Sequence, residues 1–316
     1  GRQYLGQPSD RRQRVARRRT SDVVSAQSVD PVVAVADIRA AGPRTYRKRL
    51  LSINRKNVRT ENIHLVYVSA TYTTRKVMRQ IAAQIEGRKT EYDITRSAPG
   101  AEVTMDDGDL LVVGMPVYSG RIPASALPAL RKFRGNGTPA VVVCVYGNRD
   151  YDDALLELTD VVGENGFRVA AAAAFVAQHS IFPQVGTNRP DEEDIRRIAA
   201  FVRQFRRKID SAADSASLQE VVPPGGRPYK TPGKVPLRPT GGRKCTGCGV
   251  CVERCPVQAI PAGRPRQTDP QKCIACGRCI VVCPARARRF GGLLYKIVRR
   301  KFVKAYSVRK EPDIYV

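Results

Sequence analysis

Eight of the nine cysteines in this 316-residue chain belong to two copies of one pattern. The first copy, from Cys245, is CTGCGVCVERCP, and the second, from Cys273, is CIACGRCIVVCP. Each cysteine of the first copy recurs 28 residues later, so both copies have the form C-x2-C-x2-C-x3-C-P. This part of the chain is therefore an internal duplication, and no other feature restricts its fold as strongly.

The spacing is typical of a segment that binds two [4Fe–4S] clusters. Three closely spaced thiolates bind three irons of one cubane, and the fourth cysteine projects toward the partner cluster. We expect Gly247 and Gly277 to relieve crowding where the backbone passes a cluster, and Pro256 and Pro284 to redirect the chain. The predicted ligands are Cys245, Cys248, Cys251 and Cys283 for one cluster, and Cys273, Cys276, Cys279 and Cys255 for the other.

Zinc and disulfides are the alternatives for these cysteines. A structural zinc site pairs two C-x-x-C turns and does not need a third nearby cysteine followed by C-P. A disulfide framework is typical of small secreted domains with a signal peptide. The ninth cysteine, Cys144, lies in an apolar stretch, where we expect a small buried hydrophobic side chain. Clusters of this kind imply a reducing, cytoplasmic location.

The net charge of +26 is unevenly distributed. Residues 1–60 carry 15 basic and 4 acidic side chains, residues 61–220 carry 19 and 21, and residues 221–316 carry 21 and 4. The first 60 residues lack apolar periodicity and the apolar segment of a signal peptide, which predicts a basic, disordered extension. No stretch approaches the roughly 18 apolar residues of a membrane span, so an integral membrane protein is excluded.

Between the charged ends, apolar runs alternate with helical stripes. This alternation predicts an α/β fold with a doubly wound parallel sheet. Ligands bind such sheets at the carboxyl ends of the strands, which selects the loops 69–74, 116–121 and 147–151. The predicted strands are 63–69, 91–95, 109–115, 140–147 and 167–177, and the predicted helices are 74–86, 125–133, 153–162 and 195–209.

Each of these loops carries suitable chemistry. The sequence SATYTT offers hydroxyls and backbone N–H groups at the start of a helix, where a phosphate can bind. The sequences PVYSGRIP and YGNRDY offer an aromatic ring or exposed backbone to a planar ligand. The two histidines, His64 and His179, have no third partner that spacing identifies, so structural or surface roles are expected for both.

Three segments, VSATYTTRKV, GMPVYSGRIP and VYGNRDYDDALLEL, resemble in this order the flavodoxin-fold half of bacterial flavodoxin–ferredoxin fusion proteins. The resemblance covers about residues 62–290. It implies a flavodoxin-like sheet that binds FMN, followed by a small α+β ferredoxin-like domain with two clusters. Flavodoxin phosphate loops commonly have glycine where this chain has Ala70 and Tyr72.

The resemblance also implies the residues of the flavin site. The phosphate would be bound by Ser69, Thr71, Thr73 and Thr74. The isoalloxazine would lie between two loops, with Tyr118 as the stacking side chain. These loops consist of Pro116, Val117, Tyr118, Ser119 and Gly120, and of Gly147, Asn148 and Arg149.

The expected organisation is a succession of five parts. The C-terminal part is predicted to form a basic helix that packs on the ferredoxin-like domain through Leu294, Ile297, Val298, Phe302 and Ala305. The parts are the extension 1–60, the flavodoxin-like domain 61–220, a Pro/Gly-rich linker 221–242, the two-cluster domain 243–290, and the basic helix and tail 291–316.

These observations predict an electron-transfer protein with two [4Fe–4S] clusters and FMN, linking one-electron and two-electron redox partners. Basic residues near the clusters should select redox partner proteins with acidic surfaces, and nucleic acid is not an expected partner. Two alternatives remain open. One is an FMN- and iron–sulfur-dependent reductase fed by its own clusters, for which no acid/base pair is evident. The other is a basic nucleic-acid-binding protein with structural clusters.

Overall fold

The computed structural model describes residues 58–316. The predicted N-terminal extension, residues 1–60, lies outside the described residues except for its last three. Among the described residues, no helix is long and apolar enough to cross a membrane.

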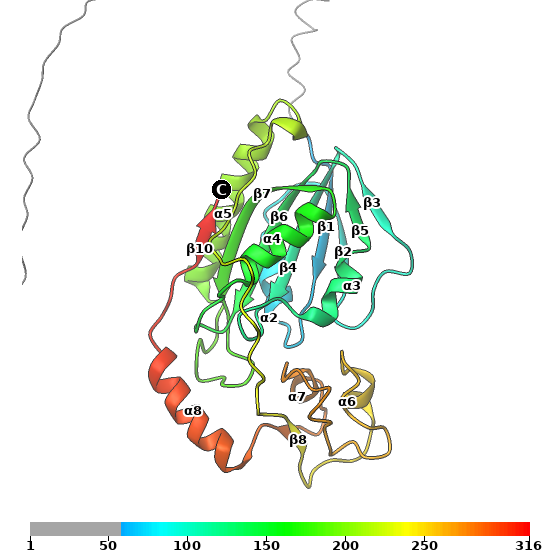
Figure 1. Cartoon of the computed structure of the whole chain (residues 1–316), viewed down its shortest axis with the longest axis vertical. Helices are drawn as coiled ribbons and strands as arrows, with labels where there is room; N and C mark the ends of the chain where they lie inside the picture. The colour runs from blue at the N-terminus through cyan, green and yellow to red at the C-terminus, as the bar shows by residue number, and fades with distance from the viewer. Residues whose placement is uncertain (1–57) are drawn as a thin grey trace, which may run out of the picture. The chain divides into compact units, whose positions relative to one another are not determined.

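Five parallel strands form the central sheet (Figure 1). Their spatial order is β2-β1-β4-β6-β7, with an antiparallel strand, β10, beside β7. Counted along the chain, the parallel strands have the order 2-1-3-4-5, which is the flavodoxin-like arrangement. All five predicted strands are confirmed, with the bounds β1 Asn62–Tyr67, β2 Arg88–Asp93, β4 Asp109–Pro116, β6 Thr138–Tyr146 and β7 Phe167–Val176.

Helices cover both faces of this sheet. On one face, α2 (Thr73–Ala82) and α5 (Glu192–Ser211) pack on the strands, and on the other face α4 (Ala154–Glu164) and α3 (Leu127–Leu130) do so. A short 3-10 turn, η3 (Ala124–Ala126), precedes α3, and another, η4 (Ser215–Ser217), follows α5. The two-sided cover buries the central strands on both faces, which explains their continuous apolar sequences.

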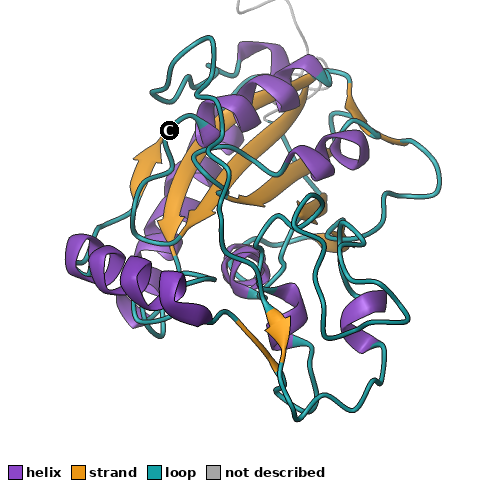
Figure 2. Ribbon diagram, turned by 60° about the horizontal axis from the view of Figure 1, so that its bottom comes forward, coloured by secondary structure: helices purple, strands orange, loops and turns teal. Residues whose placement is uncertain are grey.

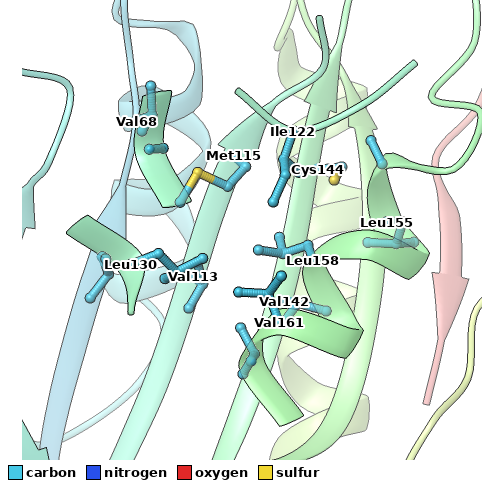
Figure 3. Packing of buried hydrophobic residues seen from close by; sticks show 14 of the residues in the cluster. Val68, Val113, Met115, Ile122, Leu130, Val142, Cys144, Leu155, Leu158 and Val161 are labelled. Carbon is cyan, nitrogen blue, oxygen red and sulfur yellow. The ribbon is translucent and has the colours of Figure 1, made fainter. Parts of the chain in front are cut away.

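Figure 3 shows the core under α4 and α3. Side chains of β4 and β6 point toward Leu155, Leu158 and Val161 of α4 in this view. Cys144 lies among them and is fully buried, which confirms its role as a small hydrophobic core residue.

Five strands in the described part of the chain were not anticipated, and three of them, β3, β5 and β10, have three residues each. The strand β10 (Asp313–Tyr315) comes from the extreme C-terminus and pairs with β7. The strands β3 (Val103–Met105) and β5 (Phe133–Gly135) form a separate two-stranded parallel ribbon. Each has only three residues, too few to show a periodic pattern.

The duplicated cysteine segment contains two equivalent short helices, α6 (Val250–Glu253) and α7 (Arg278–Val281), visible in Figure 2. A two-residue strand before it, β8 (Thr240–Gly241), pairs with β9 (Arg288–Arg289) near its end. The N-cap residues Gly249 and Gly277 have φ of 78° and 77°. The structural equivalent of Gly277 is therefore Gly249, whereas Gly247 corresponds to Ala275.

The C-terminal helix α8 (Gly292–Tyr306) differs from its predicted placement. Phe302 contacts His179 and Phe182 of the flavodoxin-like domain, with ring centroids 4.7 Å apart in both pairs. Leu294 and Ile297 are 50% and 46% exposed. Ala305 is exposed as well, so the predicted apolar face is wrong for these three residues. The helix packs on the flavodoxin-like domain as well as on the cysteine segment.

Candidate functional site

The eight repeated cysteines surround two small cavities. The fourth cysteine of each copy lines the cavity formed by the first three cysteines of the other copy. The first cysteine set is Cys245, Cys248, Cys251 and Cys283, and the second cysteine set is Cys255, Cys273, Cys276 and Cys279. Each set has the membership that the spacing predicts.

None of the nine cysteines forms a disulfide. Burial raises the pKa of Cys276 to about 12, and it also raises the pKa values of Cys251, Cys273 and Cys279. These thiols are therefore protonated at neutral pH until a metal displaces the proton. Among residues 58–316, no group of three or more His, Cys, Asp or Glu side chains is arranged to hold a single metal ion. The four sulfurs of each set instead surround a space.

Backbone N–H groups donate to several of these sulfurs. The amide of Ala259 lies 3.3 Å from Cys255 Sγ, and the amide of Ala287 lies 3.2 Å from Cys283 Sγ. These two contacts are equivalent under the duplication. Hydrogen bonds to sulfur favour the thiolate and are one of the means by which a protein sets a cluster's potential.

Two buried arginines provide a test of whether clusters fit. Arg288 lines the first cavity and is 2% exposed, and Arg278 lines the second and is 9% exposed. The Nε atom of each is buried without a hydrogen-bond partner. Neither arginine forms an ion pair with a carboxylate within residues 58–316.

A buried cation without a counter-charge is strongly unfavourable. An iron–sulfur cluster bound by four thiolates is anionic, and its sulfurs accept hydrogen bonds. A cluster in each cavity would therefore supply both the counter-charge and the acceptor that Arg278 and Arg288 lack. The residues that line the two cavities therefore fit [4Fe–4S] clusters.

A larger cavity of about 400 Å³ lies at the carboxyl ends of the parallel strands. Its volume is in the range of cofactor sites. Three of the four predicted phosphate-loop residues line it, as do seven of the eight predicted ring-flanking residues. These are Thr71, Thr73, Thr74, Pro116, Val117, Tyr118, Ser119, Gly120, Gly147 and Arg149.

Ser69 and Asn148 do not line this cavity. The Ser69 hydroxyl accepts a hydrogen bond from the Arg75 amide at 3.0 Å and so satisfies an N–H group in the first turn of α2. The Asn148 side chain donates to the carbonyls of Tyr306 and Val308, both at 2.7 Å, and accepts from the Lys310 amide at 3.1 Å. Asn148 therefore binds the C-terminal segment.

Tyr72 stands in a conformation that favours glycine, with φ of 68°. Its ring lies between two guanidinium groups, 4.6 Å from that of Arg75 and 4.7 Å from that of Arg278. Tyr72 does not line the large cavity, and as the N-cap residue of α2 it supplies no side-chain hydrogen bond. The N–H groups of Thr73 and Thr74, which precede the Arg75 amide bound by Ser69, are thus left for a ligand.

Several residues that line the large cavity were missed from the sequence. The loop after β7 contributes Ala177 to Phe182, and its position at the same sheet edge could have identified it. The His179 Nδ1 atom accepts the amides of Ile181 and Phe182, both at 3.1 Å. Burial lowers the pKa of His179 to about 4, so its ring is neutral at pH 7.

The remaining lining residues come from distant parts of the chain. They are Gly233, Lys234, Val235, Pro236 and Leu237 of the linker, Ile274 and Ala275 of the cysteine segment, and Val298 and Phe302 of α8. The linker is fixed in place because the Asp153 carboxylate accepts the amides of Gly226 and Lys230, at 2.8 and 2.6 Å. No local sequence pattern predicts these contacts, because the residues are far apart along the chain.

The second cysteine set adjoins the large cavity. Ile274 lines both the large cavity and the cavity of the second set. Tyr118, Ile274 and Cys276 also line one small shared space. Burial raises the pKa of Tyr118 well above its usual value, and the Cys276 thiolate adds to that shift. The first set's cavity shares no lining residue with the large cavity.

Residues 244–287 match the 4Fe-4S dicluster domain family. The match spans all eight repeated cysteines. No curated protein matches the chain.

Solved structures similar to the chain include three flavodoxins. One is from the domain Archaea, at 13% identity, covering 47% of this chain and 98% of that one. Another is the Fusobacterium nucleatum flavodoxin bound to flavin mononucleotide, at 15% identity, covering 48% and 99%. The third is the Streptococcus pneumonia TIGR4 flavodoxin, at 19% identity, covering 47% and 99%. The TM-score is 0.33 in each case.

The strand order of the central sheet makes the first domain flavodoxin-like. The dicluster segment follows it in the same chain. A flavodoxin-like domain joined to a 4Fe-4S domain supports an electron-transfer protein.

Proposed function

We propose that this protein carries two [4Fe–4S] clusters and one FMN and links one-electron to two-electron redox partners. Clusters exchange single electrons, and FMN accepts one or two. The observation that carries the proposal is the shared position of Ile274, which lines both the large cavity and the cavity of the second cysteine set.

In this proposal different loops bind different parts of FMN. Thr71, Thr73 and the start of α2 bind the phosphate of FMN, and Tyr118 and the backbone at Gly147 flank its ring system. Val235, Leu237 and Phe302 add apolar side chains to the cavity lining. The first and second cysteine sets each bind one cluster.

The partner is proposed to approach the first cysteine set. Cys248 is exposed, whereas Cys255, Cys276 and Cys279 of the second set are buried. The neighbouring Lys244, Arg254 and Arg286 are exposed and positive. An acidic surface on a redox partner protein complements this charge.

Anaerobic purification followed by iron, sulfide and flavin quantification tests the cofactors. About eight irons and eight sulfides per chain, by the two-cubane assignment, with about one FMN, are expected. Four or fewer irons after careful reconstitution would contradict the two clusters. Absence of flavin would leave the first domain as a scaffold.

The duplication supplies a matched pair of variants for the placement. Cys248 and Cys276 are equivalent residues of the two copies, and C248S and C276S should each reduce the iron content by about half. Only C276S should also weaken FMN binding, because only its set adjoins the large cavity. Equal loss of FMN affinity in both variants would contradict the proposed arrangement.

Stopped-flow reduction tests the proposed link. A one-electron reductant added to the wild-type protein should reduce the iron–sulfur chromophore and then the flavin, followed by their separate absorbance changes. In C276S the flavin change should slow by at least about tenfold while the first set's signal persists, an effect of roughly 1.4 kcal/mol or more on the barrier. An unchanged flavin rate would show that electrons reach the flavin without the second set.

A further inference from the structure

Arg278 connects the cysteine segment to the phosphate loop. It is the first residue of α7, lies between Cys276 and Cys279 in sequence, and is 9% exposed. Its Nη1 atom donates to the backbone carbonyls of Ser69 and Ala70, both at 3.3 Å. These acceptors lie more than 200 residues away in the sequence.

On the loop side, Arg278 supports the conformation that leaves α2 open to a ligand. A carbonyl that accepts from a guanidinium polarises its peptide and makes the N–H of the next residue a better donor. The accepted carbonyls therefore strengthen the N–H groups of Ala70 and Thr71. The guanidinium also stacks on Tyr72 and so stabilises that residue at its positive φ.

On the cluster side, Arg278 has an unused donor. Its Nε is buried without a partner, and the residue lines the cavity of the second cysteine set. No carboxylate within residues 58–316 pairs with this guanidinium. A positive group and an N–H donor beside a cluster stabilise its more negative, reduced form and so raise its potential.

The internal duplication indicates that the cysteine pattern does not itself require an arginine at the position of Arg278. The position equivalent to Arg278 in the first copy is Val250, which follows Gly249 as Arg278 follows Gly277. The arginine is present only in the copy that meets the phosphate loop, where a Cβ on Gly277 would come within 3.2 Å of Thr71 Cγ2.

We infer that Arg278 is a positioning residue that couples the second cluster to the phosphate site of the flavin, setting the cluster potential and the FMN affinity together. This inference rests on the proposed function. It goes beyond that function because a substitution at this one residue should change both the potential of the second cluster and the affinity for FMN.

The test compares R278M and R278K with the wild-type full chain, each holding its cofactors. R278M removes the charge and every donor, so FMN should bind about tenfold more weakly or worse, the size expected for lost charge-assisted hydrogen bonds. The midpoint potential of the second cluster, followed by EPR during potentiometric titration, should become more negative. R278K keeps the charge but lacks the guanidinium fork that bonds both carbonyls. Its cluster potential should therefore stay closer to the wild-type value than that of R278M, whereas its FMN affinity should still fall.

K272M is the matched control. Lys272 precedes Cys273 of the same cysteine set but is exposed, so water screens its charge. Its removal should change neither quantity. If R278M matches K272M in both potential and FMN affinity, or changes only one of the two, the coupling is refuted.

Two further outcomes are distinguishable. Should R278M fail to bind clusters, R278K and R278Q give the same comparison, and unchanged potential and affinity in both would overturn the inference. A wild-type protein without FMN, or with a single cluster, would instead refute the proposed function before any variant is made.

Discussion

Arg288 carries a positive charge at a position that is 2% exposed. Its guanidinium donates to the carbonyl of Pro239 at 2.9 Å and also to the Pro265 carbonyl and the Thr268 hydroxyl. Its Nη1 lies 4.0 Å from Cys251 Sγ. The residue therefore joins the strand β9 to segments around both cavities, because Pro265 lines the cavity of the first cysteine set whereas Pro239 and Thr268 line that of the second.

Replacing Arg288 with methionine should lower the free energy of unfolding by about 3 kcal/mol or more, because buried acceptors lose their donor. The midpoint potential of the first cluster should also become more negative. Denaturant unfolding and potentiometric titration, both anaerobic, measure the two effects. R289M removes the same charge from the exposed neighbouring residue and should change little. Similar behaviour of both variants would contradict this role.

His179 makes stability depend on pH. Burial, with the nearby Arg149, lowers its pKa from 6.5 to about 4. Between these two values the unfolded chain binds a proton that the folded protein does not, so stability falls as the pH drops through this window. From pH 7 to pH 5 this residue should remove about 2 kcal/mol from the free energy of unfolding.

The variant H179N tests this effect. An asparagine oxygen can accept the amides of Ile181 and Phe182 as Nδ1 does, but it does not titrate. The difference between the denaturant midpoints at pH 7 and pH 5 should be smaller in H179N than in the wild type. An equal pH dependence in both proteins would assign the acid sensitivity to other groups.

Single residues also show what the sequence can and cannot predict. The two cysteine sets could be predicted because the duplicated C-x2-C-x2-C-x3-C-P spacing is typical of segments that bind [4Fe–4S] clusters. Ser69 and Asn148 have suitable side chains, but partners within the fold already occupy them. Arg278 could not be found, because its acceptors become neighbours only after the chain folds.

At the scale of elements, the strands β4, β6 and β7 were predictable because burial on both faces demands continuous apolar runs. The strand β10 has no such requirement, since it pairs on one side only and takes its register from β7. The helix α8 was misplaced because several of its apolar residues are exposed, so the pattern alone does not identify the packed face. Contacts of Val298 and Phe302 decide it.

The loop 147–151 is tied to the C-terminal segment mainly through Asn148. Removing the amide in N148A should release residues 307–316, lower the free energy of unfolding by about 2 kcal/mol or more, and weaken FMN binding. Limited proteolysis after α8 measures the release, and denaturant unfolding measures the stability. Unchanged protease resistance of the C-terminus would contradict this role.

N148G separates the two causes of that loss. Asn148 has φ of 62°, which glycine adopts freely and alanine does not. Both variants lose the same three hydrogen bonds, so both should release the C-terminus. N148A should be less stable than N148G by about 1 kcal/mol, the backbone penalty for a residue with a Cβ.

At the scale of the whole molecule, the net charge differs sharply between the two parts of the described chain. Residues 61–220 carry 19 basic and 21 acidic side chains, whereas residues 221–316 carry 21 and 4. The sequence locates the excess along the chain but not on the surface. The structure adds that Lys244, Arg254 and Arg286 are exposed, as is Cys248 of the first cysteine set. We expect these charges to attract an anionic partner toward the first cysteine set.

This placement predicts how salt affects electron exchange. Reduced protein should react with an anionic one-electron oxidant at a rate that falls by about tenfold from low ionic strength to 0.5 M salt, because the positive field attracts the oxidant and salt screens it. A cationic oxidant of similar potential should show no such decrease. Stopped-flow absorbance at several ionic strengths measures both rates.

Two variants locate the source of the attraction. Residues 1–57 carry basic side chains of their own, so a chain that begins at residue 58 should retain most of the salt dependence if the field arises near Cys248. Joint replacement of Lys244, Arg254 and Arg286 by glutamine should remove it while leaving the buried Arg278 and Arg288 in place. If instead the truncation abolishes the dependence and the triple variant does not, the N-terminal charge attracts the oxidant. The basic surface around the first cysteine set would then have no part in partner selection.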